Sequence, residues 1–373
     1  MQLVALSDVR HRLQLGAPLP FNVRDADRTL LLARGQHVES QEQLAALLQR
    51  GALVDLAELQ TARDEVMKAP RGELPRLWQR GLSGISQALT ASPDGSFRDA
   101  LDDAARPVQA LVERDPDLAI FQVLRQGAGA DTEYGAQRSM QTAITAFLVS
   151  QRLGWDAAQC ERSFKVALTM NLSMLELQGQ LAHQTTPPTP AQRVALQTHP
   201  MRSVRMLELA GVADEAWLHA VLHHHEQDDG SGYPTGLTAV GDLATLARRA
   251  DVYTAKLASR ASRDALAADL AGRQMFMQDP GHPMTTALVR EFGIYPPGCF
   301  VRLSTGELAV VVQRGETITT PVVACLTTPR GTPLAAPERR ATDGRHCAVL
   351  AAVGPQQVSP GHSLDDLAAL VTG

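Results

Sequence analysis

The chain has few aromatic residues and few cysteines, and each shortage excludes a class of protein. Phe, Trp and Tyr make up only 4% of its 373 residues, whereas Ala and Leu are abundant, which favours a core of packed helices. The four cysteines are scattered without a CxxC pair, which argues against a disulfide framework or a zinc ribbon. A cysteine pattern of this kind predicts a reducing, cytoplasmic setting.

An excess of basic charge and long apolar runs are also missing. Lys and Arg total 35 against 40 Asp and Glu, giving a net charge of -5, so we expect no nucleic-acid partner, although a local basic pocket remains compatible. No stretch approaches the roughly 18 consecutive apolar residues that a membrane helix needs. The first residues lack a basic segment followed by an apolar run, so neither a secretory signal nor a membrane partner is expected.

The length and the 44% hydrophobic content predict two or three domains in a mainly α protein. Two prolines and a glycine within 66–75 indicate a linker. The expected organisation is a small mixed α/β or β-rich N-terminal unit (1–65), the linker (66–75), a helical connector (76–130), a helical-bundle domain (131–293), a small antiparallel β extension (294–355) and a tail (356–373).

Local patterns predict individual elements inside these units. Residues 164–177 are apolar nearly all round, which indicates one buried central helix. Ser40 followed by regularly spaced leucines predicts a short capped helix. Strands are expected at 30–32, 52–55, 299–303, 308–313, 321–326 and 348–353, and a short amphipathic segment at 364–371.

The histidines are concentrated in one part of the sequence. Five of the 11 histidines fall within one short stretch: His199, His219, His223, His224 and His225. If 214–226 is a helix, rotation by about 100° per residue places His224 and His225 on its apolar side and turns His219 and His223 to solvent.

Two interpretations of the inward pair stay open. The histidines either satisfy carbonyls or hydroxyls inside a core, or bind a metal, because neutral imidazole is the commonest metal ligand in proteins. A surface zinc site at His219 and His223 lacks a third ligand nearby in the sequence.

A glycine-rich acidic loop, EQDDGSGYPTGL (226–237), follows the histidines. Its glycines and proline predict a tight, irregular conformation. Beside a metal site, such a loop shapes substrate access or presents a docking surface; alone, it is an ordinary turn. The residues predicted to form the docking loop are Asp229, Gly230, Gly232, Tyr233 and Pro234.

The segment HHEQDDGSGYPTGL (224–237) resembles the HHExxDGSGYPxGL signature of HD-GYP domains. THPMRSVRML (198–207) and RRADVYTAKLASR (248–260) are similar to two further segments of that family, so the resemblance covers about 130–295. YPPGCFVRLSTGELAVVV (295–312) resembles the extension that often follows these domains.

The resemblance implies an all-helical HD-type phosphohydrolase core. Members hold two or three metals, commonly iron or manganese, and hydrolyse cyclic di-GMP with a metal-bound hydroxide. Carried over to this sequence, it implies His199, His224, His225 and Asp251 as metal ligands, and Arg260 near a phosphate of the ligand.

The sequence departs from the family at several of its metal positions, and no His-Asp dipeptide occurs anywhere in the chain. Neutral Asn cannot offset the charge of two dications, a thioether suits hard ions poorly, and an arginine opposes cation binding. The replaced positions are Met170 for the His, Asn171 for the bridging Asp, Met174 for a Lys, Tyr134 and Arg138 for a Glu–His pair, and Thr254 for an Asp.

Three hypotheses follow, in this order of preference, and the sequence leaves open whether the chain is an enzyme. The first is a catalytically degenerate module that docks partners, such as diguanylate cyclase domains, through the loop. The second is a phosphodiesterase with one divalent metal (iron, manganese or zinc) on His199, His224, His225 and Asp251. The third, in which no metal is required, is a cyclic di-GMP receptor that binds phosphates through Arg138, Arg248 and Arg260.

Overall fold

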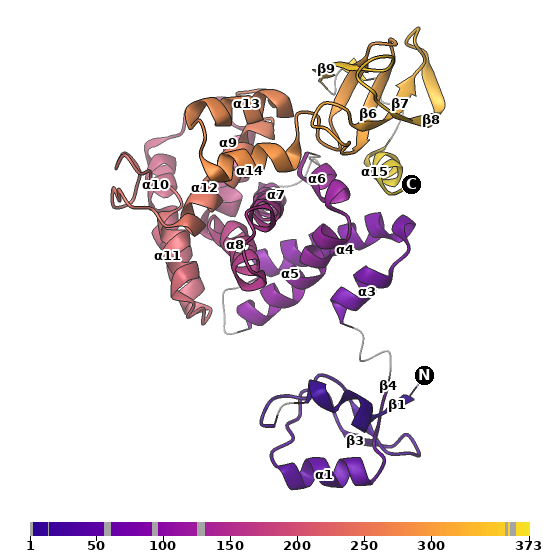
Figure 1. The fold of residues 1–373 in the computed structure, drawn as a ribbon. Coiled ribbons are helices and arrows are strands. Elements are labelled where there is room, and N and C mark those ends of the chain that lie inside the picture. The colour runs from indigo at the N-terminus through magenta and orange to yellow at the C-terminus, as the bar shows by residue number, and fades with distance from the viewer. Residues whose placement is uncertain are drawn as a thin grey trace. The chain divides into compact units, whose positions relative to one another are not determined.

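The computed structural model describes residues 3–13, 15–55, 61–91, 96–124, 131–354, 357–358 and 363–373. The chain divides into two compact units, Met1–Ala69 and Pro70–Gly373 (Figure 1). The division falls within the expected linker, 66–75, whose residues include the end of one helix and the start of another. The other expected boundaries stay predictions.

The N-terminal unit contains an antiparallel four-stranded sheet in the order β1-β4-β2-β3. Ser40 accepts a hydrogen bond from the backbone N–H of Gln43 at the start of α1, as the capping pattern predicts. The expected strands at 30–32 and 52–55 are present, whereas two very short strands carried no readable pattern. The elements are β1 (Leu3–Ala5), η1 (Leu6–Arg12), β2 (Val23–Arg24), β3 (Leu30–Leu32), α1 (Gln41–Gln49), β4 (Leu53–Asp55) and α3 (Ala62–Lys68).

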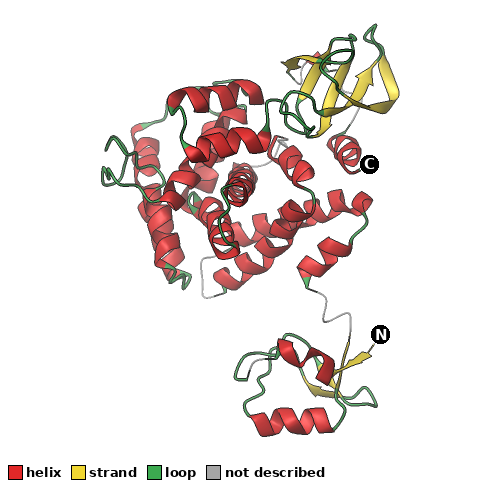
Figure 2. Cartoon of the chain, in the orientation of Figure 1, coloured by secondary structure: helices red, strands yellow, loops and turns green. Residues whose placement is uncertain are grey.

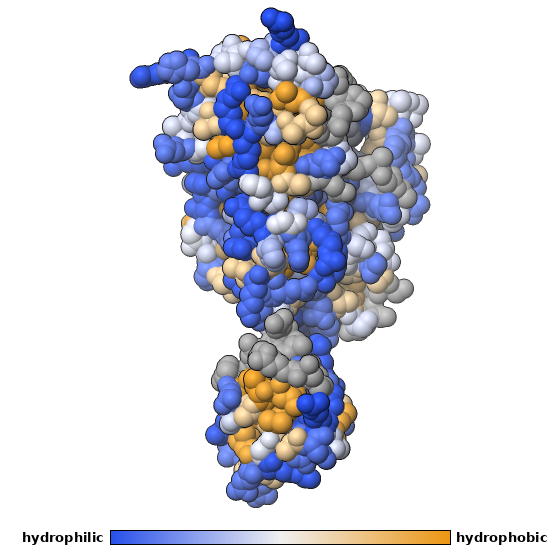
Figure 3. All heavy atoms as spheres, turned by 90° about the vertical axis from the view of Figure 1, so that its right-hand side faces the viewer, coloured by the Kyte–Doolittle hydropathy of each residue, from blue (hydrophilic) through white to orange (hydrophobic). Residues whose placement is uncertain are grey.

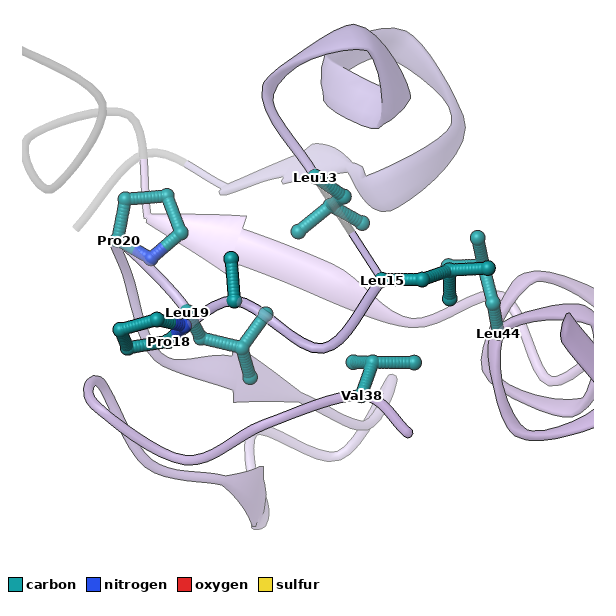
Figure 4. Close-up of a pocket in the computed structure, with 8 residues that line it drawn as sticks. Leu13, Leu15, Pro18, Leu19, Pro20, Val38 and Leu44 are labelled. Carbon is teal, nitrogen blue, oxygen red and sulfur yellow. The ribbon is translucent and has the colours of Figure 1, made fainter. Parts of the chain in front are cut away.

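Apolar side chains gather on one face of this unit (Figure 3). A small pocket in the same unit is lined by aliphatic residues and prolines alone, among them Leu13, Leu15, Val38 and Leu44 (Figure 4). The described residues that line this pocket carry no titratable side chain.

The second unit is built around a long central helix, α7 (Asp131–Arg152), which is buried along most of its length and which Figure 1 views nearly along its axis. The surrounding elements bury their apolar faces against α7 or against its neighbours. They are η2 (Arg71–Glu73), α4 (Leu74–Thr90), α5 (Phe97–Arg114), α6 (Pro116–Leu124), α8 (Ala157–Thr169), η3 (Leu172–Met174), α9 (Leu175–His183), α10 (Pro190–Leu209), α11 (Glu215–His223), α12 (Asp242–Leu257), α13 (Ala268–Gln278) and α14 (Pro283–Phe292).

Two glycines bring the backbones of α7 and α9 into direct contact. A Cβ atom added to Gly135 would lie 2.2 Å from the carbonyl oxygen of Leu175, and one on Gly179 would lie 2.2 Å from the Cα of Asp131. No larger residue fits either position without moving a helix. This crossing fixes the N-terminal turns of α7 beside α9.

The prediction of one central helix over 164–177 is wrong. Helix α8 ends at Thr169, and the chain passes through Met170 and Asn171 into η3 before α9 begins. A run that is apolar on all sides indicates burial, but it does not show whether the buried backbone is continuous. The break sets residues 170–174 against α10, because the Ser173 hydroxyl donates to the His199 carbonyl at 3.0 Å.

The helical region is followed by a five-stranded antiparallel sheet in the order β8-β7-β6-β5-β9, which Figure 2 shows in yellow at one side of the helices. The four expected strands are present. Strand β8 was not predicted, because its sequence PLAAPERRA holds two prolines and three charges, as suits an exposed edge strand. The elements are β5 (Phe300–Leu303), β6 (Leu308–Gln313), β7 (Val322–Thr327), β8 (Pro333–Ala341), β9 (Val349–Val353) and α15 (Leu364–Thr372).

The expected fold class is therefore confirmed: a mainly α protein with a helical core, a small mixed unit before it and an antiparallel β extension after it. Among the described residues, no helix combines the length and the apolar character needed to cross a bilayer.

Candidate functional site

Three histidines converge in the second unit. His199 lies on α10, while His224 and His225 lie directly after α11, and one ring nitrogen from each is within 4.8 Å of the others. The ring centroid of His199 lies 5.1 Å from that of His224 and 5.0 Å from that of His225. The structure thus brings together three of the four residues predicted as metal ligands.

Hydrogen bonds fix the protonation of two of these rings. Nδ1 of His199 lies 2.6 Å from the Leu196 carbonyl oxygen, and Nδ1 of His224 lies 2.7 Å from that of Val221. A carbonyl oxygen only accepts, so each Nδ1 carries the proton. In the neutral rings both Nε2 lone pairs face each other at 3.1 Å, which is the arrangement that a shared cation relieves.

Burial keeps the three imidazoles neutral. Desolvation, with a smaller contribution from the charge of a neighbouring histidine, lowers the pKa of His199 to about 3 and that of His225 to about 3. The pKa of the fully enclosed His224 is lowered well below its usual value, chiefly by burial. At neutral pH all three rings therefore carry the lone pairs that a metal requires.

The helix expected over 214–226 ends at His223, and this early end changes the direction in which the His223 side chain points. The backbone N–H of Glu226 donates to the His223 carbonyl at 2.9 Å as the chain turns back. His223 was predicted to face solvent, and this is wrong: it is buried, with Nδ1 3.7 Å from Oε1 of Glu226. His219 is exposed, as predicted, and its ring lies 4.3 Å from that of His223.

Glu226 organises the loop that follows, a role that the sequence analysis did not assign. Its buried carboxylate accepts hydrogen bonds from the backbone N–H groups of Thr235, Gly236 and Leu237 at 2.6, 3.1 and 3.1 Å. A Cβ on Gly232 would lie 2.4 Å from the Cα of Glu226, so the loop closes around this residue. The signal available in the sequence was the acidic residue directly after the histidine pair.

The loop residues predicted for docking take different positions. The Tyr233 ring stacks on His225 with centroids 4.6 Å apart and planes 16° apart, so the loop covers one side of the histidine group. Asp229 is exposed and binds the backbone N–H of Ser231 at 2.9 Å. Gly230 adopts a positive φ of 73°, and Pro234 follows Tyr233 through a cis peptide bond.

Asp251, the fourth predicted ligand, lies outside the histidine group. Its Oδ1 is 3.4 Å from Nη2 of Arg138, which reaches it from α7. Only 5% of the Arg138 side chain is exposed, so a fixed positive charge sits inside the domain beside this carboxylate. Burial raises the pKa of Asp251, and the charges of Arg138 and then Arg260 oppose that rise.

The other positions replaced in this chain also lie inside and carry no charge. Met170, Asn171 and Met174 are buried. The Thr254 hydroxyl lies 3.1 Å from that of Thr142, a neutral pair where the family places an acid. Three imidazoles fit one metal with an open position, but Asn171 gives no bridging carboxylate and Asp251 is bound to Arg138, so a second metal does not fit.

Comparison with known proteins agrees with this geometry. The family described as an HD domain matches residues 123–271. The cyclic di-GMP phosphodiesterase PA4108 of Pseudomonas aeruginosa is 37% identical over 131 residues, which cover 34% of this chain and 31% of that protein. The chain contains an HD-GYP family domain.

The HD-GYP match is partial in length, since the chain spans about a third of the curated relative that it matches. Among solved structures, an HD-GYP protein of Bdellovibrio bacteriovorus, Bd1817, aligns with 77% of this chain and 97% of its own chain, at 15% identity and a TM-score of 0.49. The resemblance read from the histidine and loop motifs is confirmed at the level of the family.

Proposed function

We propose that this HD-GYP domain is a catalytically impaired module of cyclic di-GMP signalling that acts by interaction rather than by hydrolysis. The observation that carries the proposal is the ion pair between Arg138 and Asp251. A carboxylate expected to bind metal is held instead by a guanidinium, which keeps its charge at every accessible pH.

The neutral side chain of Asn171 further reduces the negative charge available to bind metals. A second dication requires a negative bridging ligand, and a buried amide supplies none. Replacing one ligand-orienting group already costs about 10–100-fold in metal affinity or activity. The loss of the bridging carboxylate together with the pairing of Asp251 is expected to cost more.

The intact loop supports a docking role. Glu226 holds its backbone from within, while Asp228 and Asp229 stay exposed at its surface. Such a loop is preorganised, so a partner need not supply the ordering free energy on binding. Diguanylate cyclase domains are the partners that we propose, and the acidic surface favours a basic counterpart.

Turnover tests the loss of catalysis directly. The full chain, loaded separately with iron and with manganese, is incubated with cyclic di-GMP, and linear products are separated by chromatography. We expect no hydrolysis above that of metal-containing buffer, with an active cyclic di-GMP phosphodiesterase as the positive control. Product formation that depends on the loaded chain would overturn the proposal.

Docking needs its own experiment. Asp228→Lys/Asp229→Lys is expected to weaken binding to a purified diguanylate cyclase domain by at least about tenfold, because two exposed charges reverse. Asp103→Lys, an exposed position on α5, is the matched control. Equal affinities in both variants would remove the loop from the interface.

A phosphodiesterase with a single metal is the second candidate. The facing Nε2 lone pairs of His199 and His224 favour it, because neutral imidazoles at 3.1 Å suit a shared cation. His199, His224 and His225 would hold the metal, which supplies Lewis acidity and an activated water when bound. Metal analysis of the purified chain tests this candidate, and a stoichiometry near zero ends it.

A further inference from the structure

A second pocket lies where the helical core meets the β extension. Its volume is about 380 Å³, within the range of roughly 300–1,000 Å³ that is usual for small-molecule sites. One wall is formed by the last turns of α7 and α14, and the other by the loop 314–321 between β6 and β7. The described residues that line it include none of the three grouped histidines and none of the loop 226–237.

Ion pairs hold the two walls of this pocket together. The buried carboxylate of Glu291 on α14 accepts hydrogen bonds from Arg152 of α7 and from Arg314 of the loop. Arg314 also donates to the carboxylate of Asp117 on α6 at 2.5 Å. Because each pair joins different elements, the walls are fixed before a ligand arrives, and binding need not supply the free energy of ordering them.

Two glycines shape the backbone of the pocket. A Cβ atom on Gly315 would lie 1.8 Å from the carbonyl oxygen of Thr320, so a larger residue would displace the loop. Gly293 follows α14 with a positive φ of 73°, which residues with a side chain rarely adopt. Both glycines line the pocket, so its shape is set in part by the backbone.

Two arginines that line the pocket have hydrogen-bond donors available for a ligand. Arg290 is exposed and has neither a hydrogen bond nor an ion pair among the described residues. Arg152 uses its Nε for Glu291, and its terminal nitrogens, Nη1 and Nη2, have no partner in the same part of the chain. A guanidinium presents such N–H groups in a fork that matches the two oxygens of a carboxylate.

The pocket also has an apolar and aromatic part, to which Phe292, Tyr295, Ile318 and Pro321 contribute. The side chain of Ile318 is 52% exposed, so it leaves apolar surface in contact with water. A ligand that covers this surface gains free energy from the hydrophobic effect. The lining therefore suits a molecule with both an anionic group and an apolar body.

We propose that this pocket binds a small organic anion that combines one carboxylate with an apolar or aromatic body. Arg290 and the terminal nitrogens of Arg152 bind the carboxylate, and the body covers Ile318. The three arginines at the pocket exceed the two carboxylates that pair with them, those of Glu291 and Asp117, by one formal charge. A single negative charge on the ligand balances that excess, and the inference does not depend on the proposed function.

Saturation-transfer NMR titration of the full chain in EDTA tests the pocket, with 2-naphthoate as the probe. The amide 2-naphthamide keeps the rings without the charge, and acetate keeps the charge without the rings. We expect naphthoate to bind at least about tenfold more tightly than either control, because only naphthoate satisfies both parts of the lining. EDTA removes any metal on the histidines to which a carboxylate could bind.

Three variants at exposed positions locate the binding. Arg290→Gln is expected to weaken naphthoate binding about tenfold, because it removes a charge-assisted pair. Glu316→Gln removes a negative charge from the lining and should strengthen binding. Arg302→Gln, on β5 and outside the pocket lining, is the matched control and should leave binding unchanged. Thermal unfolding checks that all three variants fold.

Absence of naphthoate binding overturns the inference, as does equally tight binding of naphthamide. Equal affinities in the Arg290→Gln and Arg302→Gln variants also overturn it. In each of these cases Arg152 and Arg290 serve only the last turns of α7 and α14, where a cation offsets the helix dipole. None of these outcomes affects the proposed function, which turnover of cyclic di-GMP and docking of the loop test separately.

Discussion

Arg138 on α7 and Asp251 on α12 form an ion pair across 113 residues of sequence, with Nη2 and Oδ1 3.4 Å apart. The pair joins two helices that pack on each other in the core of the HD-GYP domain. It also engages the carboxylate of Asp251, which the family motif predicts as a metal ligand. One contact therefore joins two helices and, in the function that we propose, keeps Asp251 from binding a metal.

The first prediction concerns this pair. Arg138→Gln should lower the free energy of unfolding by up to about 3–5 kcal/mol, because it leaves a largely buried carboxylate without a counter-charge. Arg138→Gln/Asp251→Asn should be clearly more stable than Arg138→Gln alone. Urea unfolding of the four proteins in the cycle measures the coupling. Strictly additive effects would show that the two side chains do not interact.

The second prediction is a loss of stability in mild acid. His199 and His225 have a pKa of about 3 when folded and about 6.5 when unfolded, so the unfolded chain binds more protons between these values. Stability is therefore complete above about pH 6.5 and falls as the pH is lowered through this window, by up to about 1.4 kcal/mol per pH unit for each histidine.

Urea unfolding at pH 7 and pH 5 in EDTA measures this effect. His199→Asn should reduce the difference between the two pH values, because asparagine does not titrate. His37→Asn, at an exposed position of the N-terminal unit, should leave it unchanged. An equal pH dependence in all three proteins would contradict the assignment of neutral, buried imidazoles.

The third prediction concerns Glu226. Glu226→Ala leaves the N–H groups of Thr235, Gly236 and Leu237 without their acceptor, and each hydrogen bond to a charged group contributes about 1.5–3 kcal/mol. We expect faster amide hydrogen exchange across 227–237 and loss of the Tyr233–His225 stack. Glu226→Gln keeps one acceptor oxygen and should recover part of the protection.

Asp229→Asn serves as the control for this loop, since Asp229 is exposed and accepts hydrogen bonds from the backbone N–H and the hydroxyl of Ser231. Its exchange rates should match those of the original chain. If Glu226→Ala exchanges no faster than this control, the carboxylate does not organise the loop.

The fourth prediction concerns the crossing of α7 and α9. Gly135→Ala places a Cβ 2.2 Å from the Leu175 carbonyl oxygen, so the helices must separate, and overpacking of this kind costs about 1–3 kcal/mol or more. Gly84→Ala on α4, where the nearest atom would be 3.9 Å away, should instead be neutral or stabilising. Thermal unfolding of both variants gives the comparison, and equal melting temperatures would contradict the close contact.

The grouping of His224 and His225 and the presence of the loop after them could be predicted because their signals are local. The segment 224–237 carries its family signature within fourteen residues, and the structure brings His224 and His225 together with His199. The side to which His223 turns could not be predicted, because it depends on where α11 ends. Helical rotation applies only while the helix continues, and Glu226 draws the chain back after His223.

The strands of the β extension were predicted from β-rich runs separated by glycine-containing turns, except for β8, whose prolines and charges are compatible with an edge. The break after Thr169 was missed for a different reason. A segment that is apolar on all sides is predicted to be buried. It has no amphipathic periodicity, so the sequence does not show where the helix ends.

By itself, the sequence determined the family, the mainly α core with its β extension, and the positions at which this chain departs from the family motifs, because each of these is a matter of residue type at short spacing. Only the tertiary structure decided that Asp251 pairs with Arg138 and that Glu226 closes the loop from within. The first relationship joins two helices across 113 residues, and the second depends on where α11 ends. They depend on packing distances, such as the glycine contact between α7 and α9, which no local pattern encodes.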